Sequence, residues 1–559
     1  MAVTRMLRAT VAVVAAALVA ALFSLAAPAR ALAAGQTGSL VVSAADGAST
    51  SLRAYQLFDA DVTDGAEGKA LSNIVWASAD AKAAVEGAIA AQDASYAGAT
   101  AQDAAEWLHS HVASGASATP VAGSVPAVVA TRLAAGDADF RPLTAGKTAE
   151  LAAGYWLVTG DPDAVGTGQA ASAAILVAVG GGKVTATTKA AVPTVEKSVR
   201  EDSDDAWGKA ADATVGDELD WRLEARVPAI APAYDSYHVT FHDTLAAGIA
   251  KPEDVCVYVA AAGVEPWRKG ADPDAASGWE RLDASEFTCN YAAAADGTAT
   301  LDVRVTDVLG SAVRHGMSTD GGLSVCVVYD APLDSDAGHG ALGGNLNVTT
   351  LRYPSSPYAE GEGETTEARA IAYCWDVRLV KRDSASGKAL SGAVLRVTDD
   401  RGRHLAQDGT WTTADATVTT GSDGVVMVSG VDGGTFTVEE VSAPKGHTSF
   451  SGTRKLVLKV TGLDVDQVAS AHPVLTVSAQ SPLRADGVVE ETSLATVSVL
   501  NDGAPVAGGG GGSGSSGGLF GLPKTGDTAR LGIATALAAA GAALVVASRR
   551  RTRRSNDRR

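Results

Sequence analysis

The sequence predicts a mainly β protein made of β-sandwich domains in tandem. Between the two ends, short alternating or β-branched apolar runs are separated by Gly, Asp, Asn and Pro, a pattern typical of sandwiches rather than of βαβ units. The clearest predicted strands are Ser39–Ser43, Ala173–Val179, His238–Asp243, Val255–Val259, Ala299–Val305, Ser324–Tyr329, Val377–Lys381, Thr435–Glu440, Lys455–Val460 and Ala495–Asn501. One helix is expected at Thr100–Val112, where apolar residues such as Trp107 and Leu108 recur at helical spacing.

The N-terminus has the three parts of a secretory signal peptide. Arg5 and Arg8 precede an apolar run over residues 11–27, and the small residues Ala31-Leu32-Ala33 follow it. A charged start, an apolar stretch and a small-residue exit predict cleavage after residue 33. The alternative is an uncleaved membrane anchor, but no stop-transfer cluster follows the run.

The C-terminus carries three signals in a fixed order. Leu522-Pro-Lys-Thr-Gly526 comes first, and an uncharged apolar stretch over residues 531–548 follows, long enough to cross a bilayer as a helix. The arginine-rich tail 549–559 favours the cytoplasmic side of the membrane. The sequence therefore predicts a transmembrane helix at this end.

In this order, the three signals resemble the cell-wall sorting signal of sortase substrates in Gram-positive bacteria. The resemblance implies that a sortase recognises Leu522 and Pro523 and cleaves between Thr525 and Gly526. The enzyme would then pass the threonine carbonyl to an amine. The expected location is the cell surface, with covalent attachment to the cell wall after a transient stage as a membrane-anchored precursor.

Charge and composition exclude several classes of function. The formal net charge is −19, and it becomes more negative once the arginine-bearing ends are removed. This balance argues against binding of nucleic acid or of anionic lipid. The four cysteines are few for an exported chain and show no Cys-x-x-Cys spacing, although an even number outside the cell permits disulfides. They are Cys256, Cys289, Cys326 and Cys374.

The sequence also lacks the patterns of enzymes and cofactor sites. The close histidine pairs, His109/His111 and His238/His242, have no evident third metal ligand. No phosphate loop, nucleophile elbow or dinucleotide fingerprint stands at a strand–helix turn. We therefore expect no catalytic residues, no metal, no cofactor and no enzymatic activity.

The chain is expected to divide into six segments, since about 490 mature residues suggest roughly three domains. A Pro-bearing segment at 191–194 precedes new strands, and a Gly/Ser-rich stretch marks a flexible linker near the end. The predicted segments are 1–33 (signal peptide), 34–193, 194–373 and 374–502 (domains), 503–521 (linker) and 522–559 (sorting signal, helix and basic tail).

Six polar residues stand on the apolar faces of predicted strands, because side chains alternate between the two faces of a strand. They are Lys197, Asp243 and Asn347 in the second domain, and Lys381, Glu440 and Asn501 in the third. A desolvated lysine becomes a neutral amine, and a desolvated carboxyl keeps its proton and can polarise an amide. Attack by the amine would release ammonia and leave an isopeptide bond. The alternative is a buried ion pair with a hydrogen-bonded asparagine, or strand ends that lie in water.

The second domain resembles the isopeptide-forming domain of Gram-positive pilin backbones. The resemblance rests on Pro193–Val199, Gly216-Asp217, Phe241–Leu245 and Gly344–Tyr353. It implies an autocatalytic bond that uses Lys197, Asp243 and Asn347, with Asn345 as a second candidate on the same face.

The third domain is similar to the collagen-adhesin B-type (SpaA-type) module. The similarity is carried by Leu379–Asp383, Gly387–Ala393, Phe436–Gly446 and Val497–Asn501. It implies a bond formed by Lys381, Glu440 and Asn501. The first domain matches the N-terminal domain of such pilins more loosely, through Ala54–Phe58 and Ala153–Leu157. The family's domains imply immunoglobulin-like sandwiches.

These resemblances imply a major (backbone) pilin, polymerised and anchored by sortase. Family pilins carry their linking lysine shortly before the isopeptide lysine, where this chain has Lys189; Lys183 is the rival. A strand is expected at 183–189, and alternation with Val184 and Ala186 turns Lys189 outward. The expected partners are sortase, peptidoglycan or neighbouring pilin subunits, accessory pilins and a host surface ligand. The alternative function is a monomeric wall-anchored adhesin that binds a host matrix protein or glycan.

Overall fold

The structure is a computed structural model of the whole chain, and it is mainly β, as the sequence predicts. It describes residues 22–23, 35–65, 68–113, 118–136, 138–203, 205–267 and 278–504. The described residues up to 504 form one compact unit by their internal contacts. The linker, the Leu-Pro-Lys-Thr-Gly motif with Leu522, Pro523, Thr525 and Gly526, the expected transmembrane segment and most of the expected signal peptide lie outside the described residues. Within the described parts of the chain, no helix is both long and apolar enough to span a bilayer.

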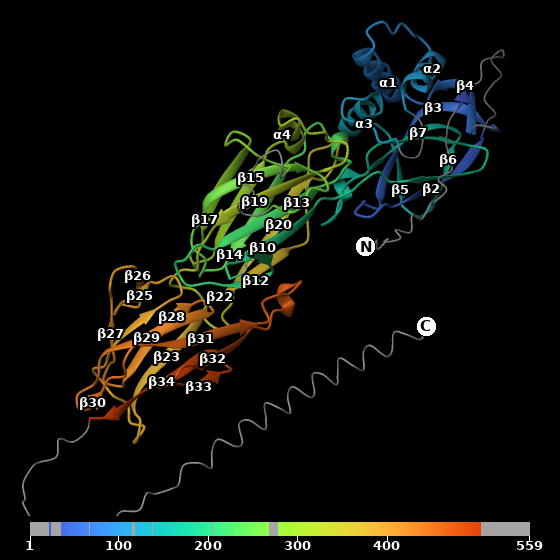
Figure 1. The fold of residues 1–559 in the computed structure, drawn as a ribbon. Coiled ribbons are helices and arrows are strands. Elements are labelled where there is room, and N and C mark those ends of the chain that lie inside the picture. The colour runs from blue at the N-terminus through green and yellow to red at the C-terminus, as the bar shows by residue number, and fades with distance from the viewer. Residues whose placement is uncertain are drawn as a thin grey trace, which may run out of the picture. The chain divides into compact units, whose positions relative to one another are not determined.

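The N-terminal module, residues 22–23 and 35–189, combines two sheets with three helices (Figure 1). Its larger sheet has the order β1-β4-β3-β7-β8, with β5 also paired to β3: β1 (Leu22–Phe23), β4 (Gly68–Trp76), β3 (Ser51–Gly65), β7 (Gly154–Gly160), β8 (Ile175–Val179) and β5 (Arg141–Thr144). Its smaller sheet has the order β6-β2-β9: β6 (Thr148–Ala152), β2 (Thr37–Ser43) and β9 (Lys183–Thr187). The helices are α1 (Ala79–Gln92), α2 (Ala101–His111) and α3 (Val125–Ala135), with the short 3₁₀ helix η1 (Pro162–Ala164).

The helices and the smaller sheet cover opposite faces of the larger sheet. Leu57 of β3 shares a buried cluster with Val85 of α1, whereas Leu52 of the same strand shares another with Leu40 of β2. The expected helix at Thr100–Val112 is α2, which begins with a capping box: the Thr100 hydroxyl accepts from the Asp103 N–H, and the Asp103 carboxylate accepts from the Thr100 N–H. Helices α1 and α3 were not expected, because their alanine-rich sequences have little contrast between two faces.

Residues 194–373 form the central sandwich. The first of its sheets, called the β13 sheet, has the order β11-β10-β13-β19-β15-β16: β11 (Ala206–Gly208), β10 (Thr194–Glu201), β13 (Asp220–Val227), β19 (Leu323–Asp330), β15 (Glu253–Ala261) and β16 (Trp279–Arg281). The second, called the β14 sheet, has the order β12-β22-β20-β14-β18-β17 with β21 on β20: β12 (Ala210–Asp212), β22 (Ala368–Tyr373), β20 (Asn345–Pro354), β14 (Val239–Leu245), β18 (Ala299–Val305), β17 (Phe287–Ala293) and β21 (Glu362–Glu364). Helix α4 (Val308–Arg314) and the 3₁₀ helix η2 (Ala231–Ala233) complete it.

Residues 375–503 form the C-terminal sandwich. Its β23 sheet has the order β28-β23-β34-β30 with β33 on β34: β28 (Val425–Val431), β23 (Trp375–Asp383), β34 (Leu494–Gly503), β30 (His447–Thr448) and β33 (Leu483–Val489). Its β29 sheet has the order β26-β25-β24-β29-β31-β32 with β27 on β24: β26 (Trp411–Thr412), β25 (His404–Leu405), β24 (Val394–Thr398), β29 (Gly434–Ser442), β31 (Thr453–Thr461), β32 (Val474–Ala479) and β27 (Val418–Thr419). A 3₁₀ helix, η3 (Val468–Ser470), precedes β32.

Alternation of side chains places polar residues in these cores. Along β20 every second residue is buried, so that Asn345 and Asn347 share the inner face with Leu351 and Tyr353. Each of the predicted strands overlaps an observed one. The alternation that predicts them is the same alternation that turns the six polar residues inward.

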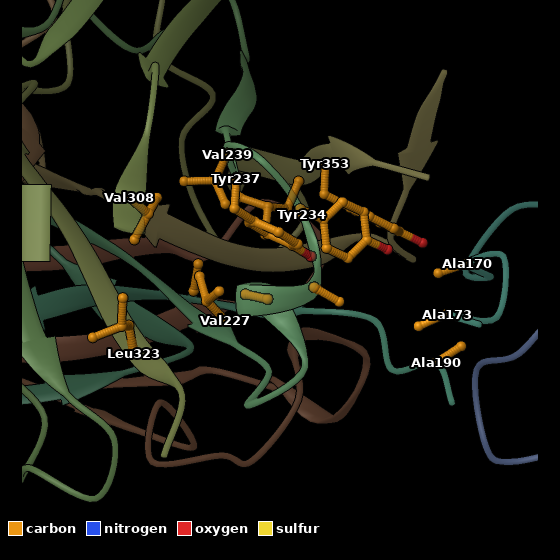
Figure 2. Packing of buried hydrophobic residues seen from close by; sticks show 14 of the residues in the cluster. Ala170, Ala173, Ala190, Val227, Tyr234, Tyr237, Val239, Val308, Leu323 and Tyr353 are labelled. Atoms are coloured by element: carbon orange, nitrogen blue, oxygen red, sulfur yellow. The ribbon is translucent and has the colours of Figure 1, made fainter. Parts of the chain in front are cut away.

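Hydrogen bonds and a tyrosine-rich cluster join the N-terminal module to the central sandwich. The Tyr353 hydroxyl donates to the Gln169 carbonyl (3.0 Å), and the Ala174 N–H donates to the Tyr358 hydroxyl (2.9 Å). Figure 2 shows Tyr353 beside Tyr234, in the same buried cluster as alanines of the N-terminal module. These contacts thus satisfy polar groups where apolar ones are buried.

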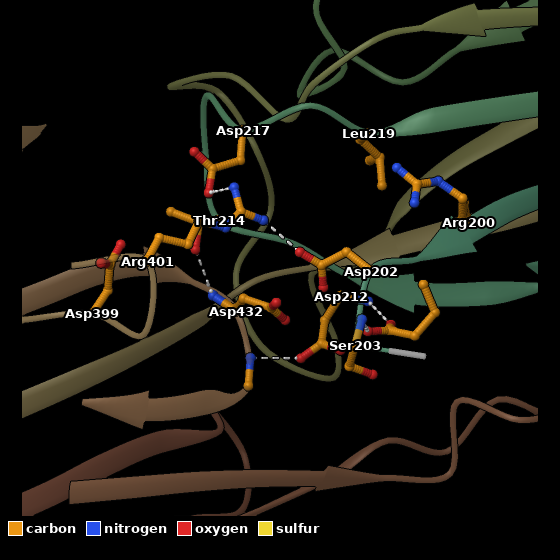
Figure 3. A network of polar contacts seen from close by, with 12 residues as sticks. Arg200, Asp202, Ser203, Asp212, Thr214, Asp217, Leu219, Asp399, Arg401 and Asp432 are labelled. Atoms are coloured by element: carbon orange, nitrogen blue, oxygen red, sulfur yellow. Dashed lines mark hydrogen bonds and ion pairs between the residues drawn. The ribbon is translucent and has the colours of Figure 1, made fainter. Parts of the chain in front are cut away.

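The central and C-terminal sandwiches meet through a network of acidic residues (Figure 3). Asp212 accepts hydrogen bonds from Trp375 Nε1 (2.6 Å) and from the Gly433 N–H (2.9 Å). The Asp432 N–H donates to the Thr214 hydroxyl (3.1 Å). The strand β22 ends only two residues before Trp375, so this network lies where the chain passes from one sandwich to the next.

Three carboxyl groups crowd together at this junction. The carboxylate oxygens of Glu201, Asp212 and Asp432 lie within 4.8 Å of one another. Burial, followed by the charge of Asp212, raises the pKa of Asp432 to about 11 and that of Glu201 to about 7. Like charges at this separation favour a shared proton, so the folded junction holds protons that the unfolded chain releases.

The pH dependence of stability therefore depends on Asp432. A carboxyl whose pKa is raised by folding destabilises the folded state increasingly as pH rises from its unfolded pKa toward its folded one. Asp432→Asn cannot titrate, so we expect the variant to gain stability over the wild type with rising pH. The gain should be at most about 1.4 kcal/mol per pH unit, measured by urea denaturation between about pH 5 and about pH 9. The exposed Asp464, changed to Asn, is the matched control. Wild-type and Asp432→Asn curves that stay parallel would contradict the prediction.

Candidate functional site: two buried lysine–acid–asparagine triads

The structure buries all six inward polar residues and brings them together as two triads. Lys197, Asp243 and Asn347 lie in the core of the central sandwich, and Lys381, Glu440 and Asn501 in that of the C-terminal sandwich. None of the six is more than 5% exposed, and both lysines are 0% exposed. Two lysines buried this completely are unusual, because a desolvated ammonium is costly unless it is paired.

In the central triad the lysine faces its partners across the sandwich. Lys197 comes from β10 of the β13 sheet, whereas Asp243 and Asn347 come from the neighbouring strands β14 and β20 of the β14 sheet. Asp243 is paired with Thr349 and Leu245 with Asn347, so the aspartate and the asparagine are diagonal neighbours on one face. The lysine Nζ donates to Asp243 Oδ1 at 2.6 Å.

A tyrosine that was not among the predicted site residues joins this triad. Tyr329 of β19 is 2% exposed, and its hydroxyl contacts all three members. It accepts from Lys197 Nζ (3.2 Å) and from Asn347 Nδ2 (2.8 Å), and it donates to Asp243 Oδ2. Alternation along the predicted strand Ser324–Tyr329 places this side chain inward, but sequence alone does not show which residues its hydroxyl reaches.

The C-terminal triad has a different layout. Lys381 on β23 and Asn501 on β34 belong to parallel neighbouring strands of one sheet, and Glu440 faces them from β29 of the other. Lys381 Nζ donates to Asn501 Oδ1 and lies 3.0 Å from Glu440 Oε1. Asn501 Nδ2 donates to the same carboxylate oxygen at 2.8 Å, and the Phe450 N–H donates to Glu440 Oε2 at 3.1 Å.

Both lysine amines have the electrostatics of a nucleophile. Burial lowers the pKa of Lys197 and of Lys381, and the neighbouring carboxylate only partly offsets this. Aromatic rings complete the surroundings: Lys197 Nζ is 5.5 Å from the centre of the Trp221 ring, and Lys381 Nζ is 5.6 Å from that of Phe450. Each pocket thus favours a neutral amine beside an amide carbon.

The structure distinguishes between Asn345 and Asn347, which the sequence leaves as alternative partners of Lys197. The Asn345 side chain bonds to backbone, with Nδ2 donating to the carbonyls of Gly338 (3.1 Å) and Ala372 (3.2 Å). Asn347 shares the Tyr329 hydroxyl with Lys197, and its Oδ1 is buried without a hydrogen-bond partner among the described residues. The geometry therefore favours Asn347 as the partner of Lys197.

Lys189 is placed differently from the sequence expectation. The predicted strand 183–189 ends at Thr187, and Lys189 forms an isolated bridge with Ala173. Its side chain is half-buried rather than fully outward, and burial lowers its pKa, while Lys183 is exposed. Beyond the end of the strand, the Lys189 N–H donates to the Ser172 hydroxyl, outside the β9 ladder (2.8 Å).

All four cysteines are free thiols in the structure. Among the described residues, the acid cluster of Glu201, Asp212 and Asp432 has the spacing of a metal site. Its oxygens accept instead from Trp375 and from backbone N–H groups. His238 and His242 pair with Glu362 (3.1 Å) and Asp302 (2.6 Å).

A family model matches part of the chain. Residues 376–468 match the family model of the SpaA prealbumin-like fold domain. This segment contains Lys381 and Glu440, whereas Asn501 lies beyond it. No curated protein sequence matches the chain.

Several solved structures are similar to the chain at low identity. The T6 backbone pilin of serotype M6 Streptococcus pyogenes is 14% identical, with 85% of this chain and 100% of that chain covered and a TM-score of 0.47. The major pilin SpaD of Corynebacterium diphtheriae is 14% identical, with 84% and 97% covered and a TM-score of 0.42. BcpA, the major pilin subunit of Bacillus cereus, is 13% identical, with 84% and 99% covered and a TM-score of 0.39.

Proposed function

We propose that this chain is a backbone pilin subunit whose two sandwiches are each closed by an internal Lys–Asn isopeptide bond. The observation that carries the proposal is the pair of buried triads, Lys197–Asp243–Asn347 and Lys381–Glu440–Asn501. The match of residues 376–468 to the SpaA domain and the sorting motif at the C-terminus support the same function. The division into domains 34–193, 194–373 and 374–502 is part of this proposal.

The chemistry is a transamidation in which all atoms are accounted for. The neutral lysine Nζ attacks the asparagine Cγ, a new C–N bond forms, and the bond from Cγ to Nδ2 breaks. One proton passes from Nζ to Nδ2 with the help of the carboxyl group, and ammonia leaves. The residues are consumed in a single turnover, so the protein modifies itself and is not an enzyme.

The placement of the bonds suits a subunit that carries tension. Lys381 is on the first strand of the C-terminal sandwich and Asn501 on the last, and these strands are parallel neighbours. A force applied at the two chain ends would shear β23 along β34. A covalent bond between these strands would carry the force past the rest of the sandwich. Lys197 and Asn347 likewise join an early strand of the central sandwich to a late one.

Polymerisation would use the sorting motif and a lysine of the next subunit. We propose that sortase joins Thr525 to Lys189 of a neighbouring copy, and that the last subunit is attached to peptidoglycan at the cell surface. The lowered pKa of Lys189 supports this role, because it increases the fraction of neutral, nucleophilic amine. Accessory pilins and a host surface ligand are further proposed partners.

Intact mass tests the cross-links. The recombinant ectodomain, residues 34–525, should be lighter than its sequence mass by two molecules of ammonia, one for each bond. Asp243→Ala, Asn347→Ala and Glu440→Ala should each restore one of them. Matched controls are Asn345→Ala and Glu439→Ala, because Asn345 bonds to backbone and Glu439 pairs with Arg396 at 2.5 Å. An ectodomain with its full sequence mass would refute the cross-link proposal.

Polymerisation is tested separately in cells that carry the cognate sortase. An immunoblot of wall extract boiled in SDS should show a high-mass ladder that collapses to monomer in Lys189→Ala and persists in Lys183→Ala. A ladder lost only in Lys183→Ala would move the linkage to that exposed lysine. A single monomer band in the wild type would overturn the backbone-pilin proposal and favour the anchored adhesin.

A further inference from the structure

The two triads differ in how the carboxylate reaches the asparagine. In the C-terminal sandwich Glu440 Oε1 contacts both the amine of Lys381 (3.0 Å) and the amide nitrogen of Asn501 (2.8 Å). In the central sandwich Asp243 contacts the Lys197 amine, but the amide nitrogen of Asn347 donates to Tyr329 instead. A carboxylate–amide contact present in one triad is thus replaced by a carboxylate–hydroxyl–amide chain in the other.

The strand register explains this difference. Asp243 and Asn347 are diagonal neighbours within one sheet, where Cβ atoms stand roughly 7–8 Å apart. Aspartate is one methylene shorter than glutamate and already directs Oδ1 at the lysine of the opposite sheet. The Tyr329 hydroxyl comes from that opposite sheet and fills the gap between Oδ2 and Asn347 Nδ2.

We propose that Tyr329 relays the proton between Asp243 and the leaving nitrogen of Asn347 during formation of the central isopeptide bond. This inference rests on the proposed function and adds a fourth residue to its chemistry. The C-terminal sandwich needs no such residue, because Glu440 touches the leaving nitrogen itself.

Each proton in the relay moves between two atoms that are hydrogen-bonded in the structure. Asn347 Nδ2 donates to the Tyr329 hydroxyl there, and it becomes an acceptor once attack on Cγ frees its lone pair. Lys197 gives one proton to Asp243 and attacks Asn347 Cγ as a neutral amine. Tyr329 then gives its proton to Nδ2 and regains one from Asp243, while the new amide nitrogen returns a proton to Asp243. Ammonia leaves, and both Tyr329 and the protonated Asp243 end as they stood at the moment of attack.

Two further features agree with this role. Burial and the charge of Asp243 raise the pKa of Tyr329 far above its ordinary value, so the hydroxyl retains its proton until an acceptor develops beside it. Asn347 Oδ1 has no hydrogen-bond partner among the described residues, whereas Asn501 Oδ1 accepts from Lys381. In the central triad, the hydrogen bonds of the structure therefore favour proton transfer to the leaving nitrogen, Asn347 Nδ2, rather than polarisation of Oδ1.

The test is the rate of bond formation in Tyr329→Phe, which keeps the ring and removes only the hydroxyl. The full chain is made by cell-free synthesis and quenched in acid at intervals, and the peptide that joins Lys197 to Asn347 is measured by mass spectrometry. We expect this bond to form about a hundredfold more slowly than in the wild type, which is typical of losing a general acid. The Lys381–Asn501 bond in the same molecules should form at the wild-type rate and reports that the chain folds.

A rescue variant separates a relay from a packing role. In Asp243→Glu/Tyr329→Phe, the added methylene occupies the space of the lost hydroxyl, and the carboxylate can reach Asn347 as Glu440 reaches Asn501. We expect the double variant to recover most of the rate. Tyr329→Phe at the wild-type rate, or a slow variant that the double change does not rescue, would overturn the relay. Absence of the Lys197–Asn347 bond in the wild type would instead refute the proposed cross-link itself.

Discussion

Burial of a lysine amine in each sandwich core is the constraint on which the rest of the site depends. An ammonium group removed from water needs a carboxylate within hydrogen-bond reach, and that carboxylate needs donors for its second oxygen. Asp243 obtains its second donor from Tyr329, and Glu440 obtains its own from the Phe450 backbone. Such a pair contributes little to stability by itself. The pair acquires a chemical role when its proton moves from the lysine to the carboxylate and leaves a neutral amine beside an amide.

The two sandwiches meet this constraint with opposite layouts. In one, the acid and the asparagine share a sheet and the lysine crosses the core. In the other, the lysine and the asparagine share a sheet and the acid crosses. The strand register then determines which nitrogen atoms the carboxylate contacts. A glutamate that crosses the core can touch both nitrogens, whereas an aspartate beside its asparagine reaches only one. The different reach of Asp243 and Glu440 thus follows from the positions of their strands relative to the asparagine.

Much of this arrangement could be predicted from period-two alternation. It predicts strands such as β18, and it turns Lys197 and Asn347 inward, because a strand offers only two faces. Two kinds of feature could not be predicted. Helices α1 and α3 have alanine-rich sequences with little amphipathic contrast, so their faces are set by the sheet that they cover. The reach of the Tyr329 hydroxyl, and the early end of β9 before Lys189, depend on contacts between segments far apart in sequence.

The junction between the sandwiches handles charge differently from the cores. There Glu201, Asp212 and Asp432 gather, and Trp375 and backbone N–H groups donate to their oxygens. Arg401 and Arg403 pair with the neighbouring acids Asp202 and Asp217 instead. In the cores an amine and an amide group lie beside the carboxyl group, which is the arrangement that the proposed cross-links require. At the junction the carboxyl groups lie within 4.8 Å of one another, which favours a proton shared between them. Buried carboxyl groups therefore have different consequences in this chain according to the neighbours that the fold supplies.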